Sequence, residues 1–431
     1  MTRDESLLLF CRSPYTALLR DFCLMIEGDR DTAEEIAPHC LQALLSMAGE
    51  TGFGGNLWHD FLTRLLVSSE NSYTLSAELR GAPDGTVREF ALHDMTVVRG
   101  WFALDLHGLA EKCGLPMIEQ IADYHTDQGE GKVYSARIRE RIETLAGQLA
   151  ECGSDSEMLD ALTSFYAHYG VGALGLHKAF RLRMADEHPV IRPITRIADV
   201  RLDDLVGYES AKEQLIRNTE AFLAGAPANN CLLYGDAGTG KSTSVKALAN
   251  TYYDRGLRII EIYRHEFRYL HQIIGEIKHR NYRFLLYMDD LSFEEFETEY
   301  KYLKAVIEGG LEKKPDNVLI YATSNRRHLV RESFRDKQKL SDDDVHRSDT
   351  VQEKLSLFDR FGLTIYFGAP TPQEYYEIVR TLAARAGISM PEDELLACAN
   401  RWELKHAGYS GRTAQQMIDD LLGKEALLRE A

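Results

Sequence analysis

The spacing of hydrophobic positions divides the chain into two parts that meet near residue 190. Before that point, apolar residues recur at three- and four-residue intervals, the period of amphipathic helices. Thr32 and Glu35 fit a capping box at the start of one such run, and further runs cover Asn56–Val67 and Val133–Leu149. The turn-forming segment Gly81–Gly85 could join a hairpin. We therefore expect residues 1–190 to form a mostly helical N-terminal domain that binds a partner protein.

Beyond this part, short apolar runs alternate with helical segments. His188–Pro193 precedes them and has the pattern of an extended linker, because proline disfavours helix in the residue before it. The alternation predicts a mostly parallel sheet covered by helices. The expected strands are Asn230–Tyr234, Leu257–Tyr263, Phe284–Met288, Val318–Thr323 and Leu363–Phe367. From Thr371 onward the strand-like runs stop, so we expect an α/β core over residues 191–368 and a helical lid over residues 369–431.

A glycine-rich segment between an expected strand and an expected helix carries the strongest chemical signal. Residues 235–242 read GDAGTGKS and match the phosphate-binding pattern GxxxxGK[ST]. Glycines let the backbone approach a ligand closely, and the amides at the helix start can cradle phosphate. Lys241 would reach the β- and γ-oxygens of ATP, and the Ser242 hydroxyl would bind Mg²⁺. The expected nucleotide-binding residues here are Gly235, Asp236, Ala237, Gly238, Thr239, Gly240, Lys241, Ser242 and Thr243.

Polar residues close two of the other expected strands. Asp289 and Asp290 follow Phe284–Met288, and Asn325 follows Val318–Thr323. An unpaired carboxylate is costly to bury, so an acid pair at the end of an apolar strand indicates a functional role. We expect Asp289 to hold Mg²⁺ together with Ser242, and Asp290 to orient or deprotonate the attacking water. Asn325 can hydrogen-bond the γ-phosphate or that water, although it could also only begin a turn.

The order of these motifs resembles the AAA+ ATPases. A segment Asp359–Gly362 and a helical tail containing Ser410–Thr413 complete the resemblance. Shorter stretches look more closely like a bacterial AAA+ family of unassigned function, and this similarity covers about residues 160–420. Those stretches are Asn218–Phe222, Pro227–Asn230, Lys246–Leu248 and Glu353–Leu357. The resemblance implies a three-layer, parallel-sheet P-loop NTPase core with a C-terminal helical lid.

The same resemblance implies further site residues and an assembly. Within the entry segment Leu202–Glu209, the residues Val206, Gly207 and Tyr208 would line the adenine pocket. Arg360 lies where the family's arginine finger acts on the nucleotide of a neighbouring subunit, which implies a ring or helical homo-oligomer, typically hexameric. Arg412 lies at the second sensor position on the lid and would contact phosphate within its own chain.

Several alternatives stay open at this stage. Arg326 and Arg327 also follow a strand end and compete for the finger role, while Arg360 and Arg412 could each form an ordinary surface ion pair. Most relatives carry Glu at the position of Asp290, so hydrolysis could be slow. The charged connection 331–354 is long enough to predict a mobile element that becomes ordered on oligomerisation or on partner binding.

Charge and composition narrow the choice of partner. The formal net charge of −17 disfavours bulk binding to nucleic acid or anionic lipid. Residues 255–283 hold seven Lys or Arg against three Glu, with aromatics between them. This segment could bind a single strand, but a solvated helix face is the favoured interpretation, so nucleic acid remains open and not favoured.

The remaining sequence features predict a reduced, non-membrane environment. The seven scattered cysteines form no CxxC pair, which argues against a zinc site or a disulfide framework. No run approaches the roughly 18 apolar residues of a membrane span, and the N-terminus lacks the features of a secretory signal. We expect a cytoplasmic protein.

Three functions are compatible with these observations. The first is an Mg-ATP-dependent AAA+ ATPase that remodels or loads a macromolecular partner. The second is a nucleotide-gated assembly module with little turnover. The third, a small-molecule kinase, is disfavoured by the helical lid and by the position of Arg360.

Overall fold

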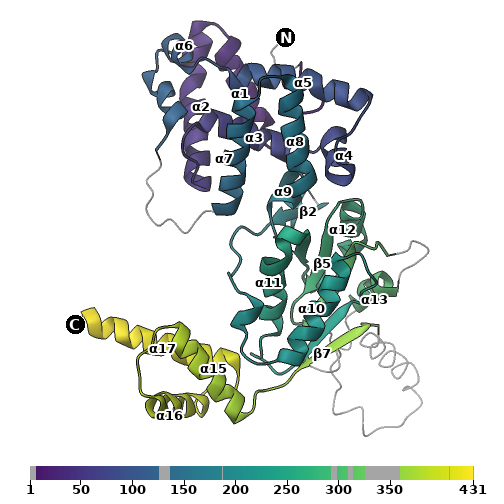
Figure 1. Ribbon diagram of the computed structural model, residues 1–431, viewed down its shortest axis with the longest axis vertical. Coiled ribbons are helices and arrows are strands. Elements are labelled where there is room, and N and C mark those ends of the chain that lie inside the picture. Colours follow the sequence, from purple (N-terminus) through teal and green to yellow (C-terminus); the bar gives the residue numbers. More distant parts are fainter. Residues whose placement is uncertain are drawn as a thin grey trace. The chain divides into compact units, whose positions relative to one another are not determined.

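A computed structural model describes residues 6–125, 136–186, 188–292, 299–308, 314–325, 360–406 and 408–430. The chain forms two compact units, residues 1–177 and 178–431, which are described separately below. Figure 1 labels their helices and strands. Among the described residues, no helix has the length and apolar character needed to cross a membrane.

The N-terminal unit is helical, as the periodicity predicts. Its α-helices are α1 (Thr16–Glu27), α2 (Arg30–Thr51), α3 (Leu57–Ser68), α4 (Ser72–Arg80), α5 (Thr86–Phe102), α6 (Leu106–Lys112), α7 (Ala136–Glu151), α8 (Asp155–Tyr169) and α9 (Gly172–Leu176), and η2 (Pro116–Asp123) is a 3₁₀ helix. Their apolar faces bury large side chains around Trp58, Trp101 and Phe61. Burial of aromatic rings of this size stabilises a helical core strongly.

Two local predictions for this unit are wrong. Helix α2 begins at Arg30, because the Asp29 side chain accepts a hydrogen bond from the Thr32 amide and caps the helix before Thr32 can. The segment Gly81–Gly85, which we expected could join a hairpin, instead connects helix α4 to helix α5. Gly81 and Gly85 both have positive φ, which ends one helix and begins the next.

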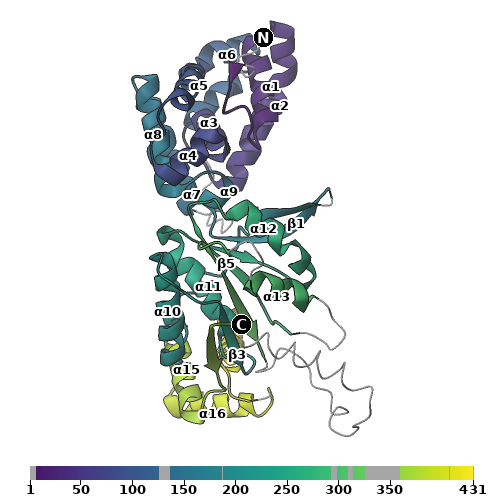
Figure 2. The same cartoon turned by 90° about the vertical axis from the view of Figure 1, so that its right-hand side faces the viewer.

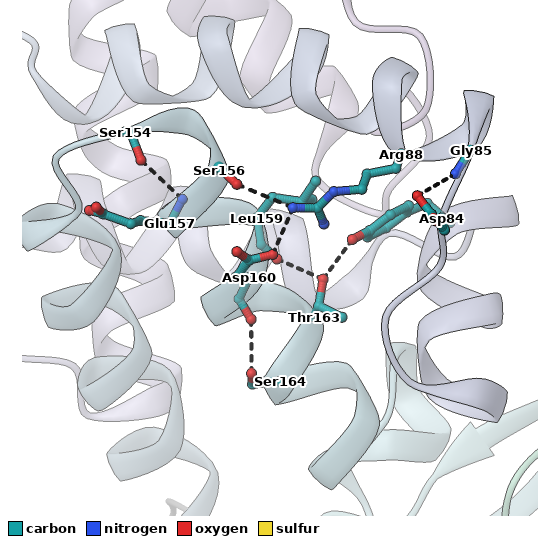
Figure 3. A network of polar contacts seen from close by, with 11 residues as sticks. Asp84, Gly85, Arg88, Ser154, Ser156, Glu157, Leu159, Asp160, Thr163 and Ser164 are labelled. Atoms are coloured by element: carbon teal, nitrogen blue, oxygen red, sulfur yellow. Dashed lines mark hydrogen bonds and ion pairs between the residues drawn. The ribbon is translucent and has the colours of Figure 1, made fainter.

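Polar contacts link α4, α5 and α8 at the edge of this core (Figure 3). Arg88 on α5 donates to Asp160 on α8 at 3.0 Å and to the Ser156 hydroxyl at 3.2 Å. The buried hydroxyls of Tyr73 on α4 and Thr163 on α8 lie 2.6 Å apart. These contacts set the register between helices that apolar packing alone would leave less specific.

The second unit contains a seven-stranded sheet. Its strands are β1 (Ala179–Ala185), β2 (His188–Pro193), β3 (Cys231–Gly235), β4 (Leu257–Glu261), β5 (Arg283–Met288), β6 (Val318–Ser324) and β7 (Leu363–Phe367), in the order β2-β1-β4-β5-β6-β3-β7. All neighbouring pairs are parallel except β1 and β2. The five predicted strands are present, and their nearly continuous burial is typical of a parallel sheet covered on both faces.

The expected linker His188–Pro193 is instead strand β2, so this prediction is wrong. Arg181 on β1 pairs directly with Arg192 on β2 in an antiparallel ladder, and the compact second unit begins at Lys178 rather than near residue 190. Strand β2 lies at the edge of the sheet. An edge strand can accommodate Pro189 and Pro193, because one row of its backbone groups needs no partner strand.

Helices cover both faces of the sheet and form a separate layer at the end of the chain. Helices α10 (Glu209–Leu223) and α11 (Lys241–Tyr252) lie on one face, while α12 (Leu270–Ile277) and α13 (Tyr300–Glu308) lie on the other (Figures 1 and 2). Short 3₁₀ helices connect these elements: η3 (Leu202–Asp204), η4 (Tyr253–Arg255) and η5 (Arg264–Tyr269). The C-terminal helices α15 (Pro372–Arg385), α16 (Glu392–Glu403) and α17 (Gly411–Glu430) share their own apolar cluster.

Candidate nucleotide-binding site

The glycine-rich loop joins the end of β3 to the start of α11, as predicted. Gly235, Gly238 and Gly240 all have positive φ. A Cβ on Gly235 would lie 2.0 Å from the Phe367 carbonyl oxygen, and one on Gly238 would lie 2.9 Å from the Ser410 hydroxyl. Only glycine fits these positions, so the loop keeps a tight turn whose amides face the start of α11.

Lys241 is 5% exposed, and its ammonium group lies inside this turn. Its Nζ donates to the carbonyl oxygens of Gly235 at 3.0 Å and Asp236 at 2.5 Å. Burial lowers the pKa of Lys241, an effect that the charges of Asp236, Asp290 and Asp289 oppose. A buried cation whose hydrogen bonds, among the described residues, go to backbone carbonyls is well suited to receive phosphate oxygens.

Asp289 lies directly beside Ser242, although the two are far apart in sequence. The Ser242 hydroxyl donates to Asp289 Oδ1 at 2.6 Å. The hydroxyls of Tyr287 and Thr323 donate to the same oxygen at 2.7 Å and 2.6 Å. Burial by itself raises the pKa of Asp289, but hydrogen bonds from Ser242, Thr323 and Tyr287 lower it overall. The carboxylate therefore stays ionised.

Asp290 adopts a left-handed backbone conformation, with φ of 49°. The Thr323 hydroxyl accepts a hydrogen bond from the Asp290 amide at 2.9 Å, and Asn325 Nδ2 donates to Asp290 Oδ1 at 2.8 Å. Such a conformation is uncommon for a residue other than glycine and needs support from its surroundings. Strand β6 supplies that support and turns the Asp290 carboxylate toward Asn325.

These side chains line a cavity of about 940 Å³ between the sheet and the C-terminal helices. This volume is near the upper end for small-molecule sites. The predicted residues that line it are Val206, Tyr208, Ala237, Gly238, Thr239, Gly240, Lys241, Ser242, Thr243, Asp289, Asp290, Asn325 and Arg412. Gly207, Gly235 and Asp236 are not among the lining residues, although the last two bind Lys241 through their carbonyls.

The entry segment and the lid enclose the side of the cavity away from the acids. Tyr208 donates to the Gly368 carbonyl at 3.0 Å, and burial raises the pKa of Tyr208 to about 12. Arg412 is the second residue of α17, and its amide donates to the Gly238 carbonyl at 3.2 Å. Arg412 also lines the cavity, beside the glycine-rich loop.

Arg360 is the predicted residue that the fold places elsewhere. Its guanidinium pairs with Glu308 at 2.6 Å and does not line the cavity of its own chain. Its Nη1 is buried and has no hydrogen-bond partner among the described residues. The competing residues Arg326 and Arg327, and the connection 331–354, lie outside the described residues.

Three residues that contribute to the site escape the sequence motifs. Tyr287 and Thr323 orient Asp289, and Arg385 on α15 donates to the backbone carbonyls of Asp203 and Asp204 in the entry segment. Tyr287 precedes Asp289 by two positions and therefore shares its side of β5, a weak signal available in advance. The roles of Thr323 and Arg385 depend on neighbouring strands and helices that no local pattern identifies.

The donor set fits Mg²⁺ and a nucleotide triphosphate. Ser242 and Asp289 offer a hydroxyl and a carboxylate, the hard oxygen ligands that Mg²⁺ prefers beside substrate phosphates. No cluster of three or more His, Cys, Asp or Glu suited to a protein-only metal site occurs in the described ranges. A metal here would therefore share its coordination with the phosphates.

A family model and a short stretch of a curated protein match this chain. A family model described as "Protein of unknown function (DUF815)" matches residues 175–425. A stretch of 69 residues is 44% identical to the replication factor C large subunit of Staphylothermus marinus, and it covers 16% of this chain and 16% of that protein.

Solved structures of a Thermotoga maritima protein are also similar. The RuvB Holliday junction branch migration motor is 16% identical, with a TM-score of 0.37 over 53% of this chain and 66% of that chain. A variant of the same motor gives 15% identity and a TM-score of 0.33 over 51% of this chain and 72% of the variant.

Proposed function

Because this chain belongs to the DUF815 family and has an AAA+ P-loop fold, we propose that it is an Mg-ATP-dependent ATPase. Nucleotide binding and hydrolysis would be coupled between subunits to the remodelling or loading of a macromolecular partner. The 2.6 Å contact between Ser242 and Asp289, beside the buried Lys241, is the observation that carries the proposal.

Each residue of the site has a task that its position supports. Lys241 Nζ would exchange the carbonyls of Gly235 and Asp236 for phosphate oxygens. Ser242 and Asp289 would hold Mg²⁺, which when bound supplies charge neutralisation on the β- and γ-phosphates. Arg412 would contact phosphate from the lid.

Asp290 and Asn325 would handle the attacking water. Asn325 donates to Asp290 Oδ1, so Oδ2 is the oxygen that would accept the proton of that water. The shared hydrogen bond fixes the direction of the carboxylate and lets Asn325 position the same water.

The position of Arg360 supports action on a neighbouring subunit. The residue does not line its own cavity, and its ion pair with Glu308 leaves Nη1 without a described partner. In a ring, possibly one of six subunits, the guanidinium would leave Glu308 and reach the γ-phosphate bound by the next chain. The N-terminal unit would recruit the partner protein, and the assembly would work in the cytoplasm.

A second function is favoured by one observation. Asp290 is shorter than glutamate and is held by Asn325 in a left-handed conformation. With its catalytic carboxylate restrained in this way, the protein would hydrolyse ATP slowly. ATP would then serve mainly to fix the assembly, as in a nucleotide-gated binding module.

Calorimetry and turnover together test both functions. We expect wild type to bind ATP with magnesium and Lys241→Ala to lose at least about 100-fold in affinity, since it lacks the charge-assisted contacts to phosphate. Asp290→Asn should bind normally and hydrolyse at least about 100-fold more slowly. Absence of binding by the wild type contradicts the ATPase proposal, and binding without turnover under assembly conditions selects the gated module.

Mixing variants tests the role of Arg360. Arg360→Ala should bind ATP but not hydrolyse it, and Lys241→Ala should do neither. If Arg360 acts in trans, mixed assemblies regain activity, because an intact nucleotide site can meet an intact Arg360 from its neighbour. Arg380→Ala, which removes an exposed arginine of the lid, is the matched control.

A further inference from the structure

The edge of the sheet farthest from β7 carries a charge pattern that the nucleotide site does not use. Arg181 and Arg192 are paired in register across β1 and β2, and Arg183 is two positions from Arg181 on the same strand. Because side chains alternate across a strand, all three arginines share one face of the hairpin. The other face holds the buried residues Phe180 and Leu182.

Like charges directly opposite each other destabilise an antiparallel pair. Arg183 and Arg192 are exposed and Arg181 is half-buried, and none of the three has an ion-pair or hydrogen-bond partner among the described residues. Carboxylates near this surface include Glu261, in register with Arg181, Asp186 in the hairpin turn, and Glu266, which lies 3.9 Å from His265 Nε2 and accepts from the Tyr263 amide at 2.8 Å. Glu261 offsets part of the charge of Arg181, but Arg183 and Arg192 form no ion pair among the described residues, so a like-charge cost remains that a bound anion would lower.

Two aromatic rings continue this face beyond the end of β4. Tyr263 donates to Glu261 at 3.1 Å, and burial raises the pKa of Tyr263 while the charge of Arg181 opposes that rise, which places Arg181 near the ring. The rings of Tyr263 and His265 are parallel within 3°, with centroids 6.0 Å apart. Tyr263 is 44% exposed and the His265 side chain 79% exposed, so neither ring packs into the core.

The geometry points to a binding surface for single-stranded nucleic acid, formed by Arg181, Arg183, Arg192, Tyr263 and His265. The planar forks of arginine match phosphate oxygens, and exposed flat rings stack on unpaired bases without regard to sequence. An acidic polypeptide would satisfy the arginines and leave the two rings without a role. This assignment names the partner class for the proposed ATPase and therefore goes one step beyond it.

A side-chain hydrogen bond connects the segment that carries the two rings to the segment that carries Asp290. Arg264 lies between Tyr263 and His265 in the sequence, and its Nη1 donates to the Ser292 carbonyl at 3.2 Å. Ser292 follows Asp290 by two positions. Strand β4 is also the neighbour of β5, which ends at the acid pair. A strand bound across Tyr263 and His265 is thus one hydrogen bond away from the segment that carries Asp290.

Fluorescence anisotropy tests the surface directly. The probe is fluorescein-labelled oligodeoxythymidylate of about 30 nucleotides, long enough to span a groove, titrated with the full chain without ATP over a series of salt concentrations. Wild type should bind at low ionic strength. The triple variant R181Q/R183Q/R192Q should bind more weakly. Its plot of log affinity against log salt should be shallower than that of the wild type by about 2, because each lost phosphate contact removes about 0.7 from the magnitude of the slope.

The ring pair should behave differently from the arginines. Y263A/H265A should lose about tenfold or more in affinity while its salt slope stays that of the wild type, because stacking releases no counterions. The matched control R30Q/R217Q/R380Q removes three exposed arginines elsewhere and should retain the wild-type slope. Melting temperatures close to wild type confirm that each variant folds.

Three results would overturn the assignment. These are no binding of the oligonucleotide at low salt, equal losses in the control and surface triples, or patch-dependent binding of labelled polyglutamate in place of the oligonucleotide. Lys241→Ala should bind the oligonucleotide normally, so failure of the nucleotide site and failure of this surface give separate outcomes.

Discussion

Asp289 and Asp60 are both aspartates, but Asp289 faces the cavity and Asp60 is buried in the helical core of the N-terminal unit. Asp289 opens onto the cavity and accepts hydrogen bonds from three hydroxyls, and these bonds lower its pKa. Asp60 on α3 is 3% exposed, and its Oδ2 has no hydrogen-bond partner in the described part of the chain. Burial first, and then the charge of Glu143, raise the pKa of Asp60 to about 8.

Burial raises the pKa of both carboxyl groups; the hydrogen bonds to Asp289 outweigh that effect, whereas Asp60 Oδ2 has no donor in the described part of the chain. Three donors on one oxygen keep Asp289 ionised and ready for a cation, whereas Asp60 keeps its proton near neutral pH. A protonated carboxyl in the N-terminal unit is compatible with a structural role, and an ionised one beside Ser242 is what a magnesium site requires.

The largest expected effect is the pH dependence of the N-terminal unit. The folded pKa of Asp60, about 8, lies above its ordinary value of 3.8, so the folded unit keeps a proton that the unfolded chain loses. Stability from this group is therefore fully present below pH 4 and falls as pH rises to 8, by about 1.4 kcal/mol for each pH unit. Glu143, whose pKa burial also raises, acts in the same direction.

Urea unfolding of the full chain measures this slope. Trp58 and Trp101 are buried in the N-terminal unit, so their emission in a Trp402→Phe background reports that unit alone. Asp60→Asn cannot ionise and should flatten most of the slope between pH 5 and pH 8. An unchanged slope would show that Asp60 is charged and paired in the native state.

The next effect tests the donors of Asp289. Thr323→Val removes a hydroxyl that donates to Asp289 and accepts from the Asp290 amide, and it leaves that amide without its partner. We expect a loss of about 2–3 kcal/mol in the stability of the second unit, because one bond is to a charged group and one donor becomes unsatisfied. The magnesium dependence of binding to a fluorescent ATP analogue should weaken as well.

Thr219→Val is the matched control for this change. Thr219 is equally buried in the same unit, and its hydroxyl contacts the Leu215 carbonyl and Tyr321 rather than the acid pair. It should lower stability without altering magnesium dependence. Equal changes in magnesium dependence for the two variants would mean that the Asp289 donors have no special role.

A smaller effect is expected for one donor among three. Tyr287→Phe removes a single hydrogen bond, and Asp289 Oδ1 still accepts from Ser242 and Thr323. The free energy of Mg-ATP binding should weaken by about 1 kcal/mol, which is a roughly fivefold loss of affinity. Tyr321→Phe should destabilise the fold more, since it deprives Asn218 and Thr219 of a partner, yet leave that affinity unchanged.

The sequence predicted the parts of this site that a local motif encodes. The glycine-rich loop, Asp289 and Asn325 stand at strand ends that the hydrophobic pattern locates, so their meeting at one edge of the sheet could be expected. Thr323 becomes a donor to Asp289 only because β5 and β6 pair in parallel, with Met288 opposite Ala322. That register depends on packing along the whole sheet and is absent from either strand alone.

Two other features show where local patterns mislead. Prolines made β2 resemble a linker, because sequence alone does not distinguish an edge strand from an extended connection. Arg360 and Glu308 form an ion pair across 52 positions, which no spacing rule foresees. Both belong to tertiary context rather than to local propensity.

The smallest effect completes the comparison with an exposed carboxylate. The Asp160 side chain is 58% exposed and pairs with Arg88 at 3.0 Å (Figure 3). Arg88→Gln should cost less than about 1 kcal/mol, because Asp160 is largely exposed and its charge stays hydrated after the change. The difference from wild type should disappear when urea unfolding is repeated at about 1 M salt, where screening is strong. A loss that persists at high salt would show that Arg88 acts through packing against α8 and not through its charge.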